Sequence, residues 1–188
     1  MNVMRTVSTR PPTSGALCRH PSASATVGSM SAESFTYTIY IRATPERIWQ
    51  AITDPSSASQ FWGVTHITDW MPGSSMTWQV AGATIADPEQ VILEAEAPHR
   101  LSFTWHTITD EFVLAVGDDD DLGASMAAEE RSTATFDVEP FGAQSKLTVT
   151  HTGFAPGSAI LAGVTEGWPM VFSSLKSLLE TGDALVFG

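Results

Sequence analysis

The last part of the chain constrains the fold most strongly. In residues 163–181 the apolar side chains Trp168, Phe172, Leu175 and Leu179 recur at offsets of 0, 4, 7 and 11, a spacing that places them on one stripe of an α-helix. One long amphipathic helix is therefore predicted here. Such a helix is stable when its apolar stripe packs against another layer of secondary structure.

The segments before this helix are predicted to form mostly short strands. Alternation of apolar and polar residues is typical of half-buried strands, and it occurs in residues 35–42, 64–70, 75–80, 89–96, 101–107, 131–139 and 145–152. Two short helices are predicted over residues 45–53 and 56–61, the first because Thr44 suits the N-cap and Pro45 the first helical position. The expected fold is α+β, with a curved antiparallel sheet around the long C-terminal helix.

Two segments lack such a pattern. Residues 1–34 are rich in Ser, Thr, Ala and Pro and show no hydrophobic periodicity, which predicts a disordered extension. An organelle transit peptide and a start-site artefact, with Met30 as the true start, are the alternatives. Residues 110–130 include four consecutive aspartates and are expected to form a long mobile loop. One domain is predicted over residues 35–188.

Composition and charge exclude several classes of function. The net charge is −12, and because residues 1–30 hold three arginines and no acid, the remainder carries 6 basic and 21 acidic side chains. Such a field repels phosphate backbones, so no nucleic-acid partner is expected. No apolar run has the roughly 20 residues of a membrane helix, so no membrane partner is expected. The one cysteine, Cys18, excludes an internal disulfide and favours a cytoplasmic location.

Four sequence pieces resemble a known family. They are ATPERIW with AITDP in residues 43–55, FWG in residues 61–63, APHRLSFTW in residues 97–105, and LTVTHTGF in residues 147–154 followed by Gly167-Trp168 and LKSLLE in residues 175–180. In this order they are similar to the START-like (SRPBCC) superfamily, in the branch named for the activator of the 90-kDa heat-shock protein ATPase. The resemblance implies a helix-grip (Bet v 1-like) fold, with a cavity between sheet and helix. Its members include lipid carriers, hormone receptors, and cyclases and dehydratases of polyketide type.

The histidines offer chemistry but no metal site. His66, His106 and His151 lie on predicted strands, yet His106 is out of phase with the apolar residues of its strand and is expected to face away from the helix. His151 is in phase with Leu147 and Val149 and is expected to face inward. It is interpreted either as a hydrogen-bonded residue at a strand end, or as a group that orients a ligand or acts as a general base. Neither a metal nor another cofactor is predicted.

Aromatic residues are the more telling feature, because the chain has six tryptophans. Most of the aromatic candidates are predicted to face the interior between sheet and helix, where they fill the core or line an apolar pocket. With His151, the candidate ligand-binding residues are Trp62, Trp78, Phe103, Trp105, Phe136, Trp168 and Phe172.

The leading hypothesis is a protein that binds a small hydrophobic or aromatic molecule. The alternatives are an enzyme of cyclase or dehydratase type that uses the same cavity, with His151 as the base, and a protein-interaction module that resembles the heat-shock ATPase activator. Any protein partner is unknown, and a monomer or a homodimer is expected.

Overall fold

The computed structural model describes residues 32–117 and 119–186, and it contains two antiparallel sheets. In the larger sheet five strands follow the order β1-β8-β7-β6-β5, and in the smaller sheet three follow the order β2-β3-β4. The strands are β1 (Glu33–Ile41), β2 (Val64–Ile67), β3 (Thr77–Val80), β4 (Ala83–Ile85), β5 (Ile92–Glu96), β6 (Arg100–Thr104), β7 (Thr133–Phe141) and β8 (Gln144–Phe154). Residues 1–31 of the predicted N-terminal extension lie outside the described residues.

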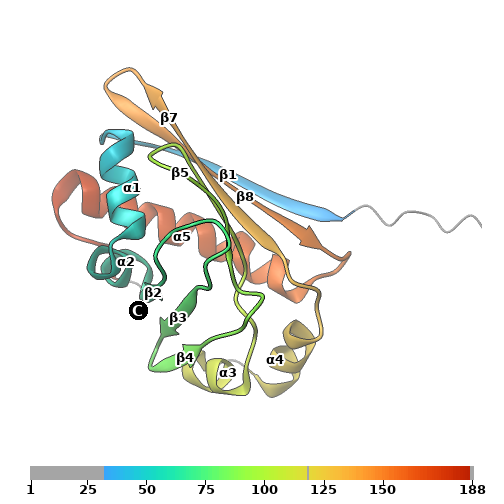
Figure 1. Cartoon of the computed structure of the whole chain (residues 1–188). Coiled ribbons are helices and arrows are strands. Elements are labelled where there is room, and N and C mark those ends of the chain that lie inside the picture. Colours follow the sequence, from blue (N-terminus) through green and yellow to red (C-terminus); the bar gives the residue numbers. More distant parts are fainter. Residues whose placement is uncertain (1–31, 118, 187–188) are drawn as a thin grey trace, which may run out of the picture.

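The long helix α5 (Ala159–Thr181) confirms the predicted helix-grip fold. It packs against β1 and β8 of the larger sheet and against the helices α1 (Pro45–Thr53) and α2 (Pro55–Trp62), and Figure 1 shows it running along one face of that sheet. Its buried residues include Trp168, Phe172 and Leu175 of the predicted stripe. The helix begins one turn earlier than predicted, because Ser158 provides an N-cap by accepting a hydrogen bond from the amide of Leu161 at 2.9 Å.

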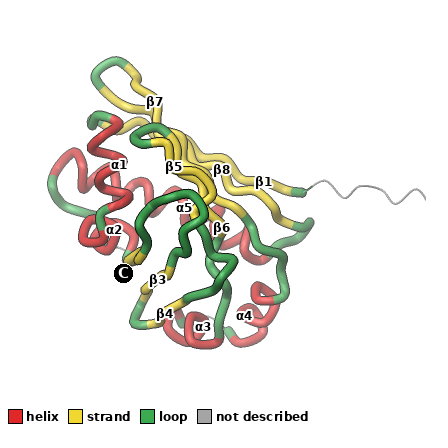
Figure 2. The backbone as a smooth tube through the Cα atoms, viewed as in Figure 1, coloured by secondary structure: helices red, strands yellow, loops and turns green. Residues whose placement is uncertain are grey.

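The strands of the larger sheet turn alternate side chains toward α5. Leu147, Val149 and His151 of β8 are fully buried, while the residues between them are half-buried. On the neighbouring strand, Ala134 and Phe136 pair with His151 and Val149, so the same face continues across the sheet. Figure 2 shows the strands of the larger sheet side by side, with β3 and β4 apart from them in the lower part of the view. The inward phase predicted for His151 is confirmed.

The helix pair α1 and α2 places one aromatic residue beside α5. Thr44 caps α1 by accepting from the amide of Arg47 at 3.4 Å, as the sequence predicted. Asp54 then caps α2 by accepting from the amide of Ser57 at 2.9 Å. The helix ends at Gly63, whose φ of +76° is readily adopted by glycine. This stop leaves Trp62 at the end of α2, packed against the core.

Two predictions about the architecture are wrong. The expected single sheet is divided in two, because β2, β3 and the unpredicted strand β4 form a sheet of their own. The expected loop over residues 110–130 contains two helices, α3 (Asp110–Val116) and α4 (Asp120–Ala127). Thr109 caps α3 by accepting from the amide of Phe112 at 3.1 Å. Within the run of four aspartates, residue 118 lies outside the described residues.

Candidate functional site

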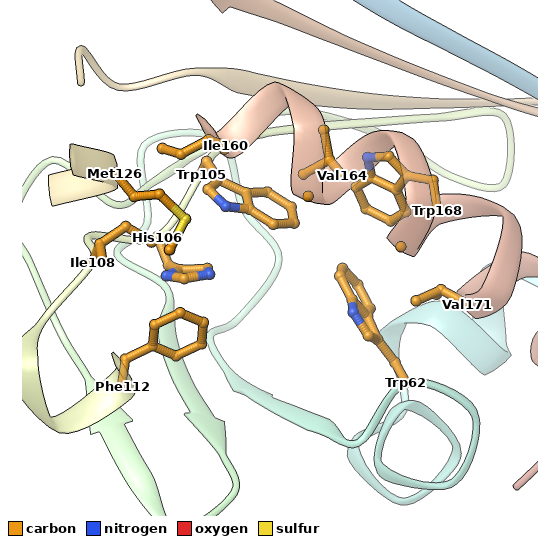
Figure 3. A pocket seen from close by; sticks show the side chains of 12 residues that line it. Trp62, Trp105, His106, Ile108, Phe112, Met126, Ile160, Val164, Trp168 and Val171 are labelled. Carbon is orange, nitrogen blue, oxygen red and sulfur yellow. The ribbon is translucent and has the colours of Figure 1, made fainter. Parts of the chain in front are cut away.

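An apolar cavity of about 230 Å³ lies beside the N-terminal half of α5. Its walls come from the end of α2, the segment that follows β6, the helices α3 and α4, and α5 itself (Figure 3). The lining residues are Trp62, Trp105, His106, Ile108, Phe112, Met126, Ile160, Gly163, Val164, Gly167, Trp168 and Val171. A concave, mostly apolar space with few polar groups is the usual form of a small-molecule site.

Three tryptophans form the aromatic wall of this cavity. The ring centroids of Trp62 and Trp168 are 5.2 Å apart, those of Trp105 and Trp168 are 5.5 Å apart, and those of Trp62 and Trp105 are 6.4 Å apart. Trp168 is almost fully buried, whereas Trp62 and Trp105 are half-buried and present part of their rings to the cavity. The three rings hold one another by tilted and edge-to-face contacts, which aromatic pairs favour.

Two of the residues that α5 contributes to the wall are glycines. Gly163 and Gly167 are one helical turn apart, and a Cβ atom added at either position would meet no atom within 4 Å. A side chain at either position would therefore enter the cavity. Glycine inside a helix costs about 1 kcal/mol relative to alanine, so these two positions keep space open at the expense of helix stability.

Among the described residues that line the cavity, His106 is the one with a titratable side chain. The sequence prediction that it faces away from the helix is wrong, because β6 ends at Thr104 and the two-residue period of a strand does not extend to residue 106. Its Nδ1 lies 2.9 Å from the carbonyl oxygen of Thr107. Burial lowers the pKa of His106 to about 4, despite the opposing effect of this hydrogen bond. The ring is neutral at pH 7.

The hydrogen bond to Thr107 fixes the tautomer of this neutral ring. A carbonyl oxygen can only accept, so Nδ1 carries the proton and Nε2 presents a lone pair. Among residues 32–117 and 119–186, no group hydrogen-bonds to this Nε2, and the atom is not fully enclosed by protein. The ring packs between Trp105 and Phe112, with centroids 5.2 Å and 4.7 Å away, and Figure 3 shows it at the cavity.

His151 lies behind the cavity and is fully buried. The indole nitrogen of Trp168 donates to its Nδ1 at 3.2 Å, which leaves the proton of the neutral ring on Nε2. That nitrogen lies 2.9 Å from the hydroxyl of Ser132, to which it donates. Burial lowers the pKa of His151 to about 3. Both ring nitrogens are thus occupied within the protein, as expected for a histidine that fixes the position of Trp168.

The remaining predicted site residues are packed in the core rather than along the cavity. Trp62, Trp105 and Trp168 line it, but Trp78, Phe103, Phe136 and Phe172 do not. All four are fully buried. Their rings support the cavity wall from behind, as when Phe136 meets Trp168 edge to face at 5.4 Å.

Sequence reasoning missed the contribution of α3 and α4. Phe112 from α3 and Met126 from α4 close the side of the cavity that faces away from the larger sheet, together with Ile108. The overlooked signal is Thr109 followed by Asp110 and Glu111, since a capping threonine before acidic residues is a typical helix start.

The two helices are joined to α5 by Glu129. Its carboxylate accepts from the hydroxyl of Ser158 and from the amides of Ala159 and Ile160, the latter two at 2.7 Å and 3.2 Å. A negative charge is favourable at a helix N-terminus, where amides lack partners within the helix. Glu129 therefore anchors the end of α4 to the start of α5, beside the cavity.

A second, more polar cavity of about 210 Å³ adjoins the first. The two share Trp105, His106, Ile108, Met126 and Ile160 in their walls. Glu89, Glu129 and Glu130 line the second cavity, as does Arg131, whose Nη2 lies 2.9 Å from the carboxylate of Asp87. His106 thus lies at the boundary between an apolar space and an acidic one.

The arrangement of sheet, long helix and cavity defines a class of protein, the helix-grip proteins of the START-like type. Within this class, the chain belongs to the family described as Activator of Hsp90 ATPase homolog 1-like protein, whose model matches residues 42–180. No curated protein matches the chain. In the described part of the chain, no helix combines the length and the apolar character that crossing a bilayer requires.

Solved structures show the same fold at low sequence identity. Protein MLL2253 from Mesorhizobium loti is 23% identical with a TM-score of 0.63, and the match covers 80% of this chain and 99% of that one. CalU16 from Micromonospora echinospora is 19% identical with a TM-score of 0.59, covering 82% and 78%. The Aha1 dimer from Colwellia psychrerythraea is 19% identical with a TM-score of 0.57, covering 80% and 98%.

Proposed function

We propose that this protein binds one small, hydrophobic or aromatic molecule in the cavity beside α5. The observation that carries the proposal is the wall itself, which combines three tryptophans with two helical glycines that leave the space open. An apolar cavity of about 150 Å³ is large enough to bind benzene. A volume of about 230 Å³ therefore suits a ligand of one or two fused rings.

The hydrogen-bond pattern supports binding rather than acid-base catalysis by His151. Its two ring nitrogens are occupied by Trp168 and Ser132, and its side chain does not line the cavity. A general base must reach the proton that it removes, directly or through one water. The enzyme alternative that depends on His151 lacks this access.

The test is a fluorescence titration with prodan, a neutral naphthalene derivative whose aromatic system is two fused rings. Wild type is expected to enhance its emission, and Gly167→Leu to abolish the saturable part, because the leucine side chain occupies the cavity. Leucine also favours the helix over glycine, so unfolding does not explain a loss. The control is Ala162→Leu, an exposed position of α5 outside the cavity wall. Equal binding by wild type and Gly167→Leu would contradict the proposal.

We further propose a cytoplasmic location and either a monomer or a homodimer. The location is supported by the single cysteine in the N-terminal stretch. The homodimer is favoured by the likeness to a protein that is itself a dimer. Sedimentation equilibrium of the full chain would decide between the two assemblies.

A further inference from the structure

We infer that the cavity selects neutral aromatic molecules that carry a hydroxyl group, and that His106 Nε2 accepts the hydrogen bond from that hydroxyl. This inference rests on the proposed function and specifies the class of ligand. His106 is 7% exposed and reaches the cavity wall, although it is surrounded by Trp105, Phe112 and Trp78. Its Nε2 has no partner among the described residues and is not fully enclosed by protein, so it is open to a molecule in the cavity. A ligand that donates to this atom gains a hydrogen bond within a mostly apolar space.

The direction of the hydrogen bond follows from the neighbouring contact. Because Nδ1 donates to the carbonyl of Thr107 at 2.9 Å, Nε2 of the neutral ring can only accept. The low pKa of His106 keeps the ring neutral throughout the physiological range. The ligand must then supply the proton, through an O–H or N–H group, while a carboxylate or a ketone oxygen finds no donor on this histidine.

Two tryptophans favour a hydroxyl over other donors. The indole N–H groups of Trp62 and Trp105 have no hydrogen-bond acceptor among the residues that the structure describes, and both side chains line the cavity. A hydroxyl can donate to His106 and accept from an indole N–H at the same time. A hydroxyl is therefore able to pair with either kind of group.

The loss of hydration in the apolar cavity disfavours anionic ligands. The adjoining polar cavity is lined by Glu89, Glu129 and Glu130, and its arginine, Arg131, is already paired with Asp87. A ligand carboxylate would lose its hydration on entering the apolar space, and neither the neutral His106 nor the paired Arg131 would replace that hydration. The ligand is thus neutral as well as aromatic.

The experiment is calorimetric titration with three matched probes, which are naphthalene, 2-naphthol and 2-naphthoate. In wild type, 2-naphthol is expected to bind more tightly than naphthalene, and 2-naphthoate more weakly than either. In His106→Leu the ratio of the affinities for 2-naphthol and naphthalene is expected to fall about fivefold. This factor corresponds to about 1 kcal/mol, the net worth of one neutral hydrogen bond.

Comparison of the two proteins cancels the cost of desolvating the hydroxyl group, because that cost is the same in both. His106→Gln offers a second variant, since its side-chain oxygen can accept a hydrogen bond and is expected to restore part of the preference. A measurement on wild type alone gives an independent check. The ¹⁵N resonance of His106 Nε2 is expected to move further on addition of 2-naphthol than on addition of naphthalene.

The outcomes separate the two proposals. Failure of wild type to bind any probe overturns the proposed function and this inference together. Binding of naphthalene and 2-naphthol with the same ratio of affinities in wild type and His106→Leu overturns this inference and leaves the proposed function in place. Equal movement of the Nε2 resonance with both probes overturns the inference without recourse to a variant.

Discussion

Because three histidines are buried, we predict that the free energy of unfolding falls steeply when the pH drops below about 6.5. Burial lowers the pKa of His66 and His151 to about 3 and that of His106 to about 4 in the folded state, whereas each stays near 6.5 in the unfolded chain. Between these values the unfolded state binds more protons, so the free energy of unfolding falls as the pH falls.

The size of the loss at pH 5 depends mainly on the unfolded state. One pKa unit corresponds to 1.36 kcal/mol, and pH 5 lies about 1.5 units below the unfolded pKa, so each histidine costs about 2 kcal/mol. The three together cost about 6 kcal/mol relative to pH 7.5. Carboxyl groups whose pKa is lowered in the folded state, such as those of Asp54 and Asp69, add little in this window, because an ordinary pKa near 4 leaves them mostly ionised in the unfolded chain at pH 5.

The perturbation that tests this reasoning is His66→Phe. His66 is the sharpest case, because both of its ring nitrogens are buried and neither has a partner among residues 32–117 and 119–186. It packs between Trp62 and Trp78, with ring centroids 5.2 Å and 4.5 Å away, so an aromatic replacement suits the space. The variant is expected to lose about 2 kcal/mol less than wild type between pH 7.5 and pH 5.

The assay is urea denaturation of wild type and His66→Phe at both pH values. Phe103→Leu serves as the control, because it disturbs a neighbour of His66 without removing a titratable group. Its stability is expected to fall by a similar amount at each pH. The same pH dependence in His66→Phe and wild type would refute the reasoning.

Two further predictions concern α3 and α4. Glu129→Gln removes the negative charge that caps α5 and is expected to lower the free energy of unfolding by about 1 kcal/mol, as measured by urea denaturation. The control is Glu130→Gln at the exposed neighbouring position, which is expected to leave the free energy of unfolding unchanged. Equal stability of the two variants would contradict the capping role of Glu129. Gly123→Ala places a Cβ 2.6 Å from a methyl group of Val113 and is expected to cost about 1–3 kcal/mol. In a Val113→Ala background the same change is expected to be neutral or stabilising, and an equal cost in both backgrounds would refute the contact.

Local rules predicted the elements that obey a regular period. The apolar stripe of α5 and the alternation along β8 both follow from one buried face, so Trp168, Phe172, Val149 and His151 were placed inward from sequence alone. The start of α1, with Thr44 as its N-cap, was also predicted from the sequence. These are features that a few adjacent residues decide.

The cavity depended on features that no period describes. His106 follows the last residue of β6, so its direction is set by contacts with Thr107 and Phe112 rather than by alternation. Phe112 and Met126 reach the cavity only because α3 and α4 fold back onto α5, which long-range contacts such as those of Glu129 determine. The periodic pattern shows which aromatic side chains point inward, but it does not show which of them line the cavity and which are packed in the core.

The central claim is that a small molecule occupies the space bounded by α5 and the tryptophans. Native mass spectrometry of the full chain, purified from the organism that encodes it, tests this claim most directly. Wild type and the control Ala162→Leu are expected to retain one added small-molecule mass per chain, and Gly167→Leu is expected to show the bare chain. The bare mass in wild type, or the same added mass in Gly167→Leu, would contradict the account.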